Sequence, residues 1–234
     1  MYNTFNMKEI GHIKSDFSEK FGIPRQSGLV NELKAQIVFE DEFNDFNAFN
    51  GLEGFSHIWL IWKFSQAIRE NWSPKVRPPR LGGNKYMGVF ATRSPFRPNP
   101  IGLSCVKLEK IEKTKEDGVV LHIAGADLLD GTPIFDIKPY IPYADAHPNA
   151  LGGFTDETPK KTLSVVFAEN CHSILKEEKR RALEGVLQQD PRPAYQNDPD
   201  RIYIMNFAQF EIKFSVKNDI LTVISIDKIK NGEK

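Results

Sequence analysis

The sequence is poor in cysteine, and it lacks both a long apolar run and a secretory signal. Cys105 and Cys171 are the only cysteines, and their wide separation excludes a disulfide scaffold and a clustered zinc site. The longest apolar run, residues 58–64, is far shorter than the roughly 20 residues that span a bilayer. Residues 1–17 contain no apolar signal segment. We therefore expect a cytoplasmic protein with reduced thiols, no membrane segment and no metal.

Several common catalytic motifs are also absent. The chain has no phosphate-binding loop ending in Gly-Lys-Ser/Thr, and no Gly-x-Gly-x-x-Gly after a strand. It contains neither the Gly-x-Ser-x-Gly elbow of hydrolases nor the His-Glu-x-x-His pair of zinc proteases. Ser94, Ser104 and His57 are of residue types that occur in catalytic triads, but nothing in their spacing supports one. The sequence thus excludes the usual nucleotide-binding folds and the commonest hydrolases.

Acidic residues are missing from residues 71–108, although the whole chain has 31 basic and 31 acidic residues. Within this segment the sequence places seven cations: Lys75, Arg77, Arg80, Lys85, Arg93, Arg97 and Lys107. A local excess of one charge attracts the opposite charge. Phosphate is the favoured partner of this segment, and a carboxylate is the alternative.

The first 140 or so residues predict many short strands separated by turns rich in Gly and Pro. That pattern indicates a β-barrel or a sandwich. The expected strands are residues 35–40, 55–64, 87–91, 104–108, 118–124 and 134–138. We expect residues 55–64 to be buried on both faces, with His57 as a core histidine or, less favoured, a catalytic base. The recurrence of Phe43, Phe46, Phe49 and Leu52 predicts a short helix with an apolar stripe.

A second unit follows a polar, Gly-containing boundary at residues 149–160. We expect a strand at 163–167, an amphipathic helix at 169–188 with a solvated charged face, and a hairpin at 210–226. The fold class is therefore mainly β, with an N-terminal barrel domain (1–148) and a small α+β C-terminal domain (161–234).

Two loops combine proline with arginine and an aromatic residue: residues 92–100 with Arg93, Phe96 and Arg97, and residues 190–195 with Arg192 and Tyr195. Proline fixes φ, so these side chains project from a stiff backbone. Arginine contacts phosphate, and aromatic rings stack on unpaired bases. From the residues alone we expect a basic ligand-binding face that favours RNA or a nucleotide.

The motifs of the chain resemble those of the TsaA/TrmO family, also called YaeB-like, over essentially its whole length. They are Pro24-Arg25-Gln26-Ser27-Gly28, Gly51-Leu52-Glu53-Gly54-Phe55-Ser56-His57, Arg77-Pro78-Pro79-Arg80-Leu81-Gly82-Gly83-Asn84, residues 88–104, Asp130-Gly131-Thr132-Pro133 and Asp190-Pro191-Arg192-Pro193-Ala194-Tyr195. The resemblance implies a homodimeric, S-adenosylmethionine-dependent tRNA methyltransferase with a single-sheeted β-barrel. Its substrate would be N6 of the threonylcarbamoyl-adenosine next to the anticodon, and the C-terminal unit would help to hold tRNA.

The same resemblance implies a set of site residues. S-adenosylmethionine would meet Pro24, Arg25, Gln26, Ser65, Gln66, Arg93, Leu103, Leu128, Leu129, Asp130 and Gly131. Many relatives have His where this chain has Ser65, which makes that contact the least secure. The anticodon loop of tRNA would meet Arg80, Arg97, Arg192 and Tyr195. The catalytic base is unknown, with Asp130, Asp127 and His57 as candidates.

Two alternatives belong to other functional classes. A non-catalytic RNA-binding module of the same fold would bind no S-adenosylmethionine. A transferase or hydrolase of small nucleotides would act in the absence of tRNA.

Overall fold

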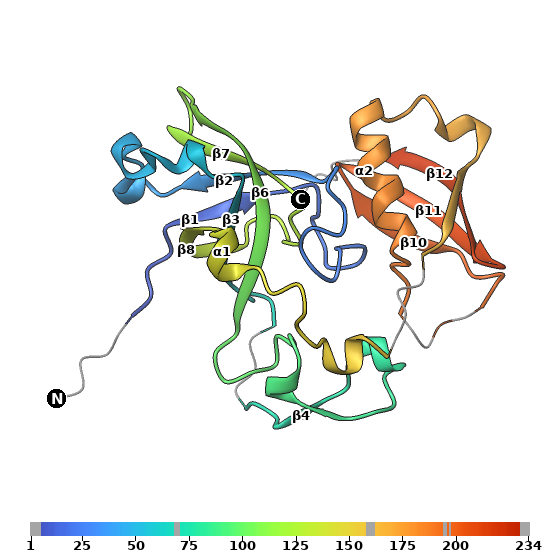
Figure 1. Ribbon diagram of the computed structural model, residues 1–234. Helices are drawn as coiled ribbons and strands as arrows, with labels where there is room; N and C mark the ends of the chain where they lie inside the picture. The colour runs from blue at the N-terminus through green and yellow to red at the C-terminus, as the bar shows by residue number, and fades with distance from the viewer. Residues whose placement is uncertain (1–5, 68–70, 158–161, 194–195, 197, 230–234) are drawn as a thin grey trace.

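The structure, a computed structural model, describes residues 6–67, 71–157, 162–193, 196 and 198–229. Its N-terminal part is a closed barrel of antiparallel neighbours in the order β1-β2-β7-β6-β3-β8 (Figure 1). The strands are β1 Gly11–Lys14, β2 Lys34–Phe39, β3 His57–Lys63, β6 Ile101–Lys113, β7 Val119–Ala124 and β8 Pro133–Pro139. The predicted mainly β fold with a single-sheeted barrel is confirmed.

The core of the barrel follows the alternation of side chains along its strands. On β3, Ile58, Leu60 and Trp62 are buried, whereas the residues between them are partly exposed on the outer surface. The prediction that residues 55–64 are buried on both faces is therefore wrong, because each strand of a closed barrel turns only one face inward. Gly102 pairs with Trp62, and a Cβ atom there would lie 2.2 Å from the indole. The indole thus occupies the space that a larger residue on β6 would need.

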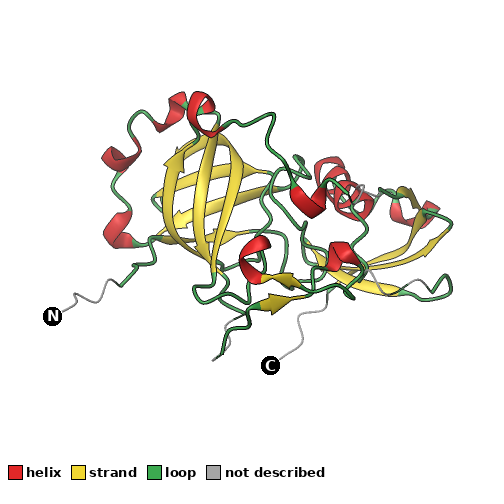
Figure 2. Ribbon diagram, turned by 60° about the horizontal axis from the view of Figure 1, so that its bottom comes forward, coloured by secondary structure: helices red, strands yellow, loops and turns green. Residues whose placement is uncertain are grey.

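The predicted helix at residues 43–52 does not form. The segment is divided into three 3-10 turns, η1 Asp41–Phe43, η2 Phe46–Phe49 and η3 Leu52–Gly54, and Figure 2 shows such turns outside the barrel sheet. Gly51, with φ of 86°, separates the last two turns. Of the expected stripe only Phe49 is buried. The spacing of three therefore reflects successive tight turns, not a continuous helix.

A long connection between β3 and β6 carries a small hairpin. Its strands are β4 Lys75–Val76 and β5 Met87–Gly88, which pair antiparallel, and η4 Pro79–Leu81 lies between them. The strand predicted at 87–91 is thus only two residues long and continues as the 3-10 turn η5 Val89–Ala91. The proline-rich residues 92–100 follow without helix or strand, as expected of a stiff loop. After β8 come α1 Pro142–Asp145 and η6 Gly153–Thr155.

The C-terminal part is a four-stranded sheet in the order β10-β11-β12-β9, covered by helix α2 (Figure 1). Its elements are β9 Ser164–Phe167, η7 Glu169–Cys171, α2 Glu177–Gln188, β10 Tyr203–Phe207, β11 Phe210–Lys217 and β12 Ile220–Lys228. The predicted hairpin is confirmed as β11–β12. Its turn residues Asn218 and Asp219 have φ of 50° and 62°, the left-handed conformation that tight hairpin turns require.

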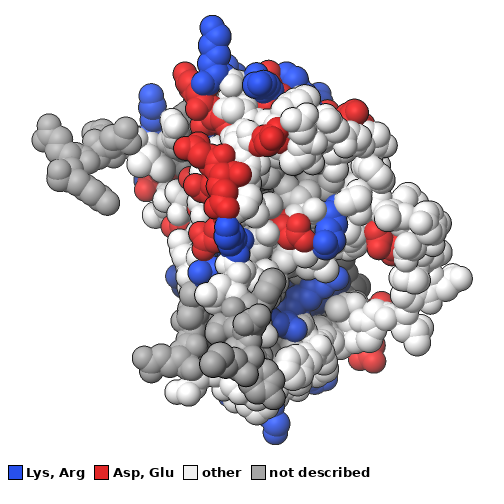
Figure 3. Space-filling view, turned by 90° about the vertical axis from the view of Figure 1, so that its left-hand side faces the viewer, with Lys and Arg blue, Asp and Glu red and all other residues white. Residues whose placement is uncertain are grey.

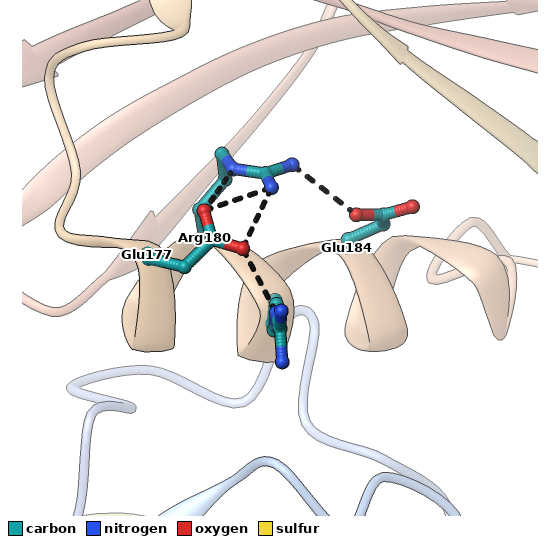
Figure 4. Close-up of polar contacts among 4 residues, drawn as sticks. Glu177, Arg180 and Glu184 are labelled. Atoms are coloured by element: carbon teal, nitrogen blue, oxygen red, sulfur yellow. Dashed lines mark hydrogen bonds and ion pairs between the residues drawn. The ribbon is translucent and has the colours of Figure 1, made fainter.

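Helix α2 begins later than the sequence predicts, at Glu177 in place of residue 169. Its buried side consists of Ala182, Leu183, Val186 and Leu187. On its solvent side, Arg180 donates to Glu177 at 2.9 Å and forms an ion pair with Glu184 at 3.5 Å (Figure 4). Such pairs three and four residues apart support a surface helix. The predicted solvated charged face is therefore present.

The core of the C-terminal part extends into the β1–β2 connection. Phe17, Val30 and Leu33 pack in the same buried cluster as Leu183 and Phe207. The rings of Phe17 and Phe207 lie edge to face with centroids 5.5 Å apart. The β1–β2 connection, which is predicted to bind the cofactor, is thereby fixed near both of its ends by packing against the C-terminal core. Among the described residues, no helix has the length and apolar composition needed to cross a membrane.

Candidate active site at the end of the barrel

Three connections meet at one end of the barrel, because β1, β3 and β7 run toward this end and β2, β6 and β8 run away from it. They are residues 15–33, 64–100 and 125–132. Together with the start of β6, they contain all residues predicted to bind the cofactor: Pro24, Arg25, Gln26, Ser65, Gln66, Arg93, Leu103, Leu128, Leu129, Asp130 and Gly131. Positions far apart in the sequence are therefore gathered at one place.

Hydrogen bonds join the first two connections to each other and to β6. The Arg93 guanidinium donates to the side-chain oxygen of Gln26. The Ser27 hydroxyl accepts from the backbone N–H of Cys105 at 3.1 Å. Lys20 donates to the carbonyl of residue 66 at 2.7 Å. We call the side chains at the centre of this arrangement the barrel-end cluster: Gln26, Ser27, Arg93, Ser104 and Asp127.

Asp127 lies at the centre of the barrel-end cluster. The buried Ser104 hydroxyl donates to it at 2.6 Å, and Trp62 in turn donates to Ser104 at 3.0 Å. Burial raises the pKa of Asp127, and this effect outweighs the opposing hydrogen bonds from Ser104 and the Ser27 backbone and the charge of Arg93. A carboxylate that is oriented by a buried donor chain and has a raised pKa suits proton transfer or the binding of a cation.

The segment from Leu128 to Gly131 is fixed mainly through its backbone. The Leu128 carbonyl accepts from Ser15 at 3.0 Å, and the Asp130 carboxylate accepts from the Ser15 N–H at 2.9 Å. The Leu128 side chain is buried in the barrel core, whereas Leu129 packs against the C-terminal core. Asp130 itself is exposed. The fully buried Leu128 can therefore offer a ligand only backbone atoms, whereas the side chain of Leu129 is partly exposed.

The remaining predicted cofactor residues differ in exposure. Pro24 is buried, whereas Ser65 and Gln66 are exposed after the end of β3. Leu103 is 54% exposed on the outer surface of the barrel, where it pairs with Ile61 of β3. A ligand that touches Leu103 and Asp127 would have to reach over the rim, because Leu103 faces outward on β6 whereas Asp127 contacts the inward-facing Ser104.

His57 lies apart from the barrel-end cluster. It begins β3, whose other end leads into the cluster, so roughly 20 Å of strand separates them. Its ring is exposed, contacts the Ser56 hydroxyl at 2.9 Å and packs edge to face on Tyr140. The prediction of a core histidine is therefore wrong, because β3 begins at the barrel surface. The structure does not bring His57 together with Asp127 or Asp130.

The predicted RNA-contacting arginines of the first basic segment have different surroundings. Arg80 is exposed in η4. The Arg97 guanidinium donates to the carbonyls of Thr92 and Ser94, at 3.0 and 3.4 Å. Arg97 thus holds its own loop together, whereas Arg80 projects from the hairpin turn. Both contacts with RNA stay predictions.

Arg192 is 8% exposed and lies in a two-pronged ion pair with Asp190, with nitrogen–oxygen distances of 2.8 and 2.9 Å. These hydrogen bonds raise the pKa of Arg192. Its carbonyl accepts from Arg25 at 3.5 Å, which connects this loop to the first cofactor loop. Its contact with RNA stays a prediction, as does that of Tyr195, which lies outside the described residues.

Charge is unevenly distributed over the surface. Figure 3 shows a face on which acidic side chains gather in a band, while basic side chains line a recess next to it. A separate cavity of about 400 Å³ lies between the barrel wall and α2 and is lined by residues that include Lys14, Lys34 and His122. Its Lys179 is already paired with Asp16. This cavity contains none of the predicted site residues, so the barrel-end cluster remains the candidate site.

Sequence reasoning missed the partners that orient Asp127, namely Ser27, Ser104 and Trp62. Ser104 had one local signal: Gly102, Ser104, Val106 and Leu108 occupy the inward positions of β6, and a serine in such a row is a buried polar group that needs a partner. The partners of Ser104 come from β3 and the β7–β8 connection. Their identity therefore depends on how the barrel closes.

The fold defines an antiparallel β-barrel protein, and the mixed-charge barrel-end cluster is its candidate ligand site. Two family models match the chain: the tRNA-methyltransferase O N-terminal domain at residues 12–146 and the TrmO C-terminal domain at residues 160–229. The chain therefore belongs to the TrmO family.

Characterised relatives match over much of the chain. A tRNA (adenine(37)-N6)-methyltransferase of Escherichia coli is 41% identical over 233 residues, which cover 96% of this chain and 99% of the relative. A protein of the same name from Eikenella corrodens is 49% identical and covers 74% of this chain and 97% of its own length. The crystal structure of TrmO from Pseudomonas aeruginosa superposes with a TM-score of 0.79 at 35% identity, covering 97% of this chain and 99% of that one.

Proposed function

We propose that this chain is an S-adenosylmethionine-dependent methyltransferase that modifies N6 of adenine 37 in tRNA. The observation that carries the proposal is the match along nearly the full length of both this chain and the Escherichia coli enzyme of that name. Proteins of the same name in Eikenella corrodens and Mus musculus support it. We further propose that the adenosine carries a threonylcarbamoyl group and lies next to the anticodon.

The barrel-end cluster, together with Arg25 and Asp130 on the same connections, suits S-adenosylmethionine, which has a carboxylate, an ammonium group, a sulfonium charge and ribose hydroxyls. Arg25 and Arg93 form no ion pair with a carboxylate among the described residues, so either is free to bind the carboxylate end. Asp127 and Asp130 supply negative charge for the cationic and hydroxyl groups. When bound, S-adenosylmethionine supplies a methyl group that its sulfonium charge activates for transfer. The remaining predicted contacts, Pro24, Gln26, Ser65, Gln66, Leu103, Leu128, Leu129 and Gly131, are part of this proposal.

Asp127 is the proposed catalytic base. The N6 atom of the modified adenosine resembles a urea nitrogen, so its lone pair is delocalised and its proton must leave as the methyl group is gained. The raised pKa of Asp127 makes it a stronger base than an ordinary aspartate, and Ser104 keeps one of its oxygens oriented. Asp130 is held by the Ser15 N–H and is proposed to bind a ribose hydroxyl. His57 has no role in this scheme because of its distance from the cluster.

The rate then depends mainly on placing the N6 atom in line with the methyl group. The anchored β1–β2 connection and the proline-rich residues 92–100 give the cluster a stiff frame. We propose that Arg80, Arg97, Arg192 and Tyr195 contact the anticodon loop, with the exposed Arg80 as the most accessible of the described three. We further propose that the protein is a cytoplasmic homodimer. Each subunit has two domains, residues 1–148 and residues 161–234, and the second assists tRNA binding.

Mass spectrometry of tRNA nucleosides tests the proposal directly. Substrate tRNA is taken from cells that lack the methylation and is incubated with the protein, with and without S-adenosylmethionine. We expect the threonylcarbamoyl nucleoside to gain the mass of one methyl group only when both are present. An unchanged mass would contradict the proposal. Turnover of free nucleotides without tRNA would indicate a small-nucleotide enzyme, and tRNA binding without cofactor binding would indicate an RNA-binding module.

A further inference from the structure

Hairpin β4–β5 exposes three aromatic side chains that the barrel-end cluster does not use. Trp72, Tyr86 and Phe90 are 50%, 56% and 71% exposed. A group of large apolar side chains left in water is a sign of a binding surface. We call these three residues, together with Lys75 and Arg77, the hairpin surface.

The rings of the hairpin surface are already arranged in pairs. Trp72 and Phe90 stack with centroids 6.1 Å apart and an angle of 30° between their planes. The Arg77 guanidinium carbon lies 4.5 Å from the centre of the Tyr86 ring, and the guanidinium also donates to the Tyr86 hydroxyl. The same hairpin thus carries a stacked ring pair and an arginine held on a ring, flat faces and positive charge of the kind that bind unpaired nucleotides.

Strand pairing and packing support these side chains from beneath. The β4–β5 ladder is extended by a hydrogen bond from the Val89 N–H to the Pro74 carbonyl at 2.9 Å. The Val89 side chain is only 1% exposed, so the turn that carries Phe90 is packed against the protein. Side chains on a fixed support lose less conformational freedom when they bind. The hairpin therefore resembles a preformed platform.

The charge of the hairpin selects its partner. Lys75, Arg77, Arg80 and Lys85 are all exposed, and residues 71–108 contain no Asp or Glu. Among the residues that the structure describes, no carboxylate forms an ion pair with these cations. Exposed cations next to aromatic rings favour a polyanion with accessible bases. A second copy of the chain fits less well, because a symmetric contact would bring like charges together.

Building on the proposed function, we propose that the hairpin surface binds unpaired nucleotides of the tRNA anticodon loop. Trp72 and Phe90 stack on a base, while Lys75 and Arg77 contact backbone phosphates. The hairpin belongs to the β3–β6 connection, which also carries Arg93 of the barrel-end cluster (Figure 1). One connection thus presents both the RNA platform and part of the cofactor site, so that binding of the loop positions the target adenosine.

Steady-state kinetics of a double variant, Trp72→Ala with Phe90→Ala, test the stacking. We expect KM for tRNA to rise about 10- to 100-fold, the range that corresponds to the loss of one stacked base. kcat at saturating tRNA and the affinity for S-adenosylmethionine should stay within about twofold, because stacking on the hairpin is equally strong in the ground and transition states. The matched control is Tyr143→Ala, which removes an aromatic side chain that is 92% exposed on α1. It should leave KM unchanged.

Two further measurements separate stacking from a structural effect. Titration with an anticodon stem-loop RNA should quench tryptophan fluorescence in the parent protein. Trp72→Phe should keep the affinity and lose most of the quenching, because Phe still stacks. In a second series, Lys75→Ala with Arg77→Ala should lower the salt slope of RNA binding by about 0.7 for each phosphate that the variant no longer neutralises.

The outcomes distinguish this proposal from the proposed function. If the parent protein methylates tRNA and the Trp72/Phe90 double variant has unchanged KM and RNA affinity, the hairpin proposal is overturned. Persistent quenching in Trp72→Phe would overturn the stacking on that residue. A double variant that changes its oligomeric state in sedimentation while keeping RNA affinity would assign the surface to a protein contact. If the parent methylates nothing, the proposed function fails, and the binding titrations still decide the role of the hairpin.

Discussion

Two proline-rich loops each place an arginine near an aspartate, and the two pairs are arranged in opposite ways. Arg192 is buried and closed onto Asp190 by a two-pronged ion pair. Arg93 is exposed, donates to Gln26 and influences Asp127 only through its charge. The first pair stabilises a loop. The second leaves both charged groups available to a ligand.

The difference between the pairs comes from where the acid lies in the sequence. Asp190 is two residues from Arg192, so both belong to one loop and can pair without help from the rest of the fold. Residues 71–108 contain no acid, so Arg93 can meet a carboxylate only across connections. Arg93 is therefore available to a ligand, whereas Arg192 is occupied by Asp190.

The largest expected effect concerns the second pair. Asp127→Asn should lower kcat for methyl transfer about 10²- to 10⁴-fold, because the amide cannot accept the N6 proton. The melting temperature at neutral pH should be equal to or above that of the parent, since burial makes the charged form of Asp127 costly. Asp130→Asn is the matched control, with a smaller loss of cofactor affinity and an unaffected proton-transfer step. If Asp127→Asn kept full kcat, Asp127 would not be the base.

The pH dependence sharpens the same assignment. The folded-state pKa of Asp127 is raised, so its carboxylate becomes protonated at a higher pH than an ordinary aspartate. We expect kcat/KM to fall as pH is lowered through that raised value, with the acid limb above the range of exposed carboxylates. Asp127→Asn should retain a low activity without this limb. An acid limb that is identical in the parent and the variant would point to another group.

The first pair should respond through stability. Asp190→Ala leaves the buried Arg192 guanidinium unpaired and should lower the free energy of unfolding by about 3 kcal/mol. Part of this loss would come from φ of 51° at residue 190, which alanine tolerates poorly. Asp190→Asn tolerates that φ and keeps one acceptor, so it should lose less. Chemical denaturation measures the free energy of unfolding of both variants. Exposed ion pairs usually contribute roughly 0–1 kcal/mol, so a change below about 0.5 kcal/mol in Asp190→Ala would show that the pair is dispensable.

Local patterns predict much of the fold. The alternation in residues 210–216 and the Asn218-Asp219 turn determine hairpin β11–β12 through neighbouring residues alone. Strand β10 does not emerge from such patterns and becomes evident only from its pairing with β11. The start of α2 is predicted too early for a similar reason. Residues 169–171 form a 3-10 turn against β12, a tertiary contact that helical periodicity does not reveal.

The site is less accessible from the sequence than the fold. Resemblance to a family supplies the candidate residues, whereas their grouping depends on three connections meeting at one end of the barrel. The orientation of Asp127 by Ser104 and Trp62 joins two strands and a loop. No local rule pairs such residues. The burial of Arg192 and its ion pair with Asp190 likewise emerge only from the structure.

A smaller effect tests which arginine faces the cofactor. Arg93→Ala should weaken the binding of S-adenosylmethionine about tenfold, as expected for the loss of a charge-assisted hydrogen bond. Arg192→Ala is the matched control and should leave the affinity of the folded protein unchanged while lowering its melting temperature. Isothermal titration calorimetry measures both. If cofactor binding were weaker in Arg192→Ala alone, Arg192 and not Arg93 would face the cofactor. A lower salt slope of tRNA binding in Arg192→Ala would support the predicted contact of Arg192 with phosphate.

The smallest effect comes from a third arginine–carboxylate arrangement, on the surface of α2. Glu177 accepts from Arg180 (Figure 4) and from Arg181, which lowers its pKa, but the Glu177 carboxylate is open to solvent. Glu177→Gln should therefore change the melting temperature by no more than about 1 °C at neutral pH. The difference should vanish below the lowered pKa, where the carboxylate is protonated in the parent, and at high salt, where the attraction is screened. If the melting temperature changed more in Glu177→Gln than in Asp190→Ala, then the distance between the charged groups, and not their burial, would determine how much such a pair stabilises the protein.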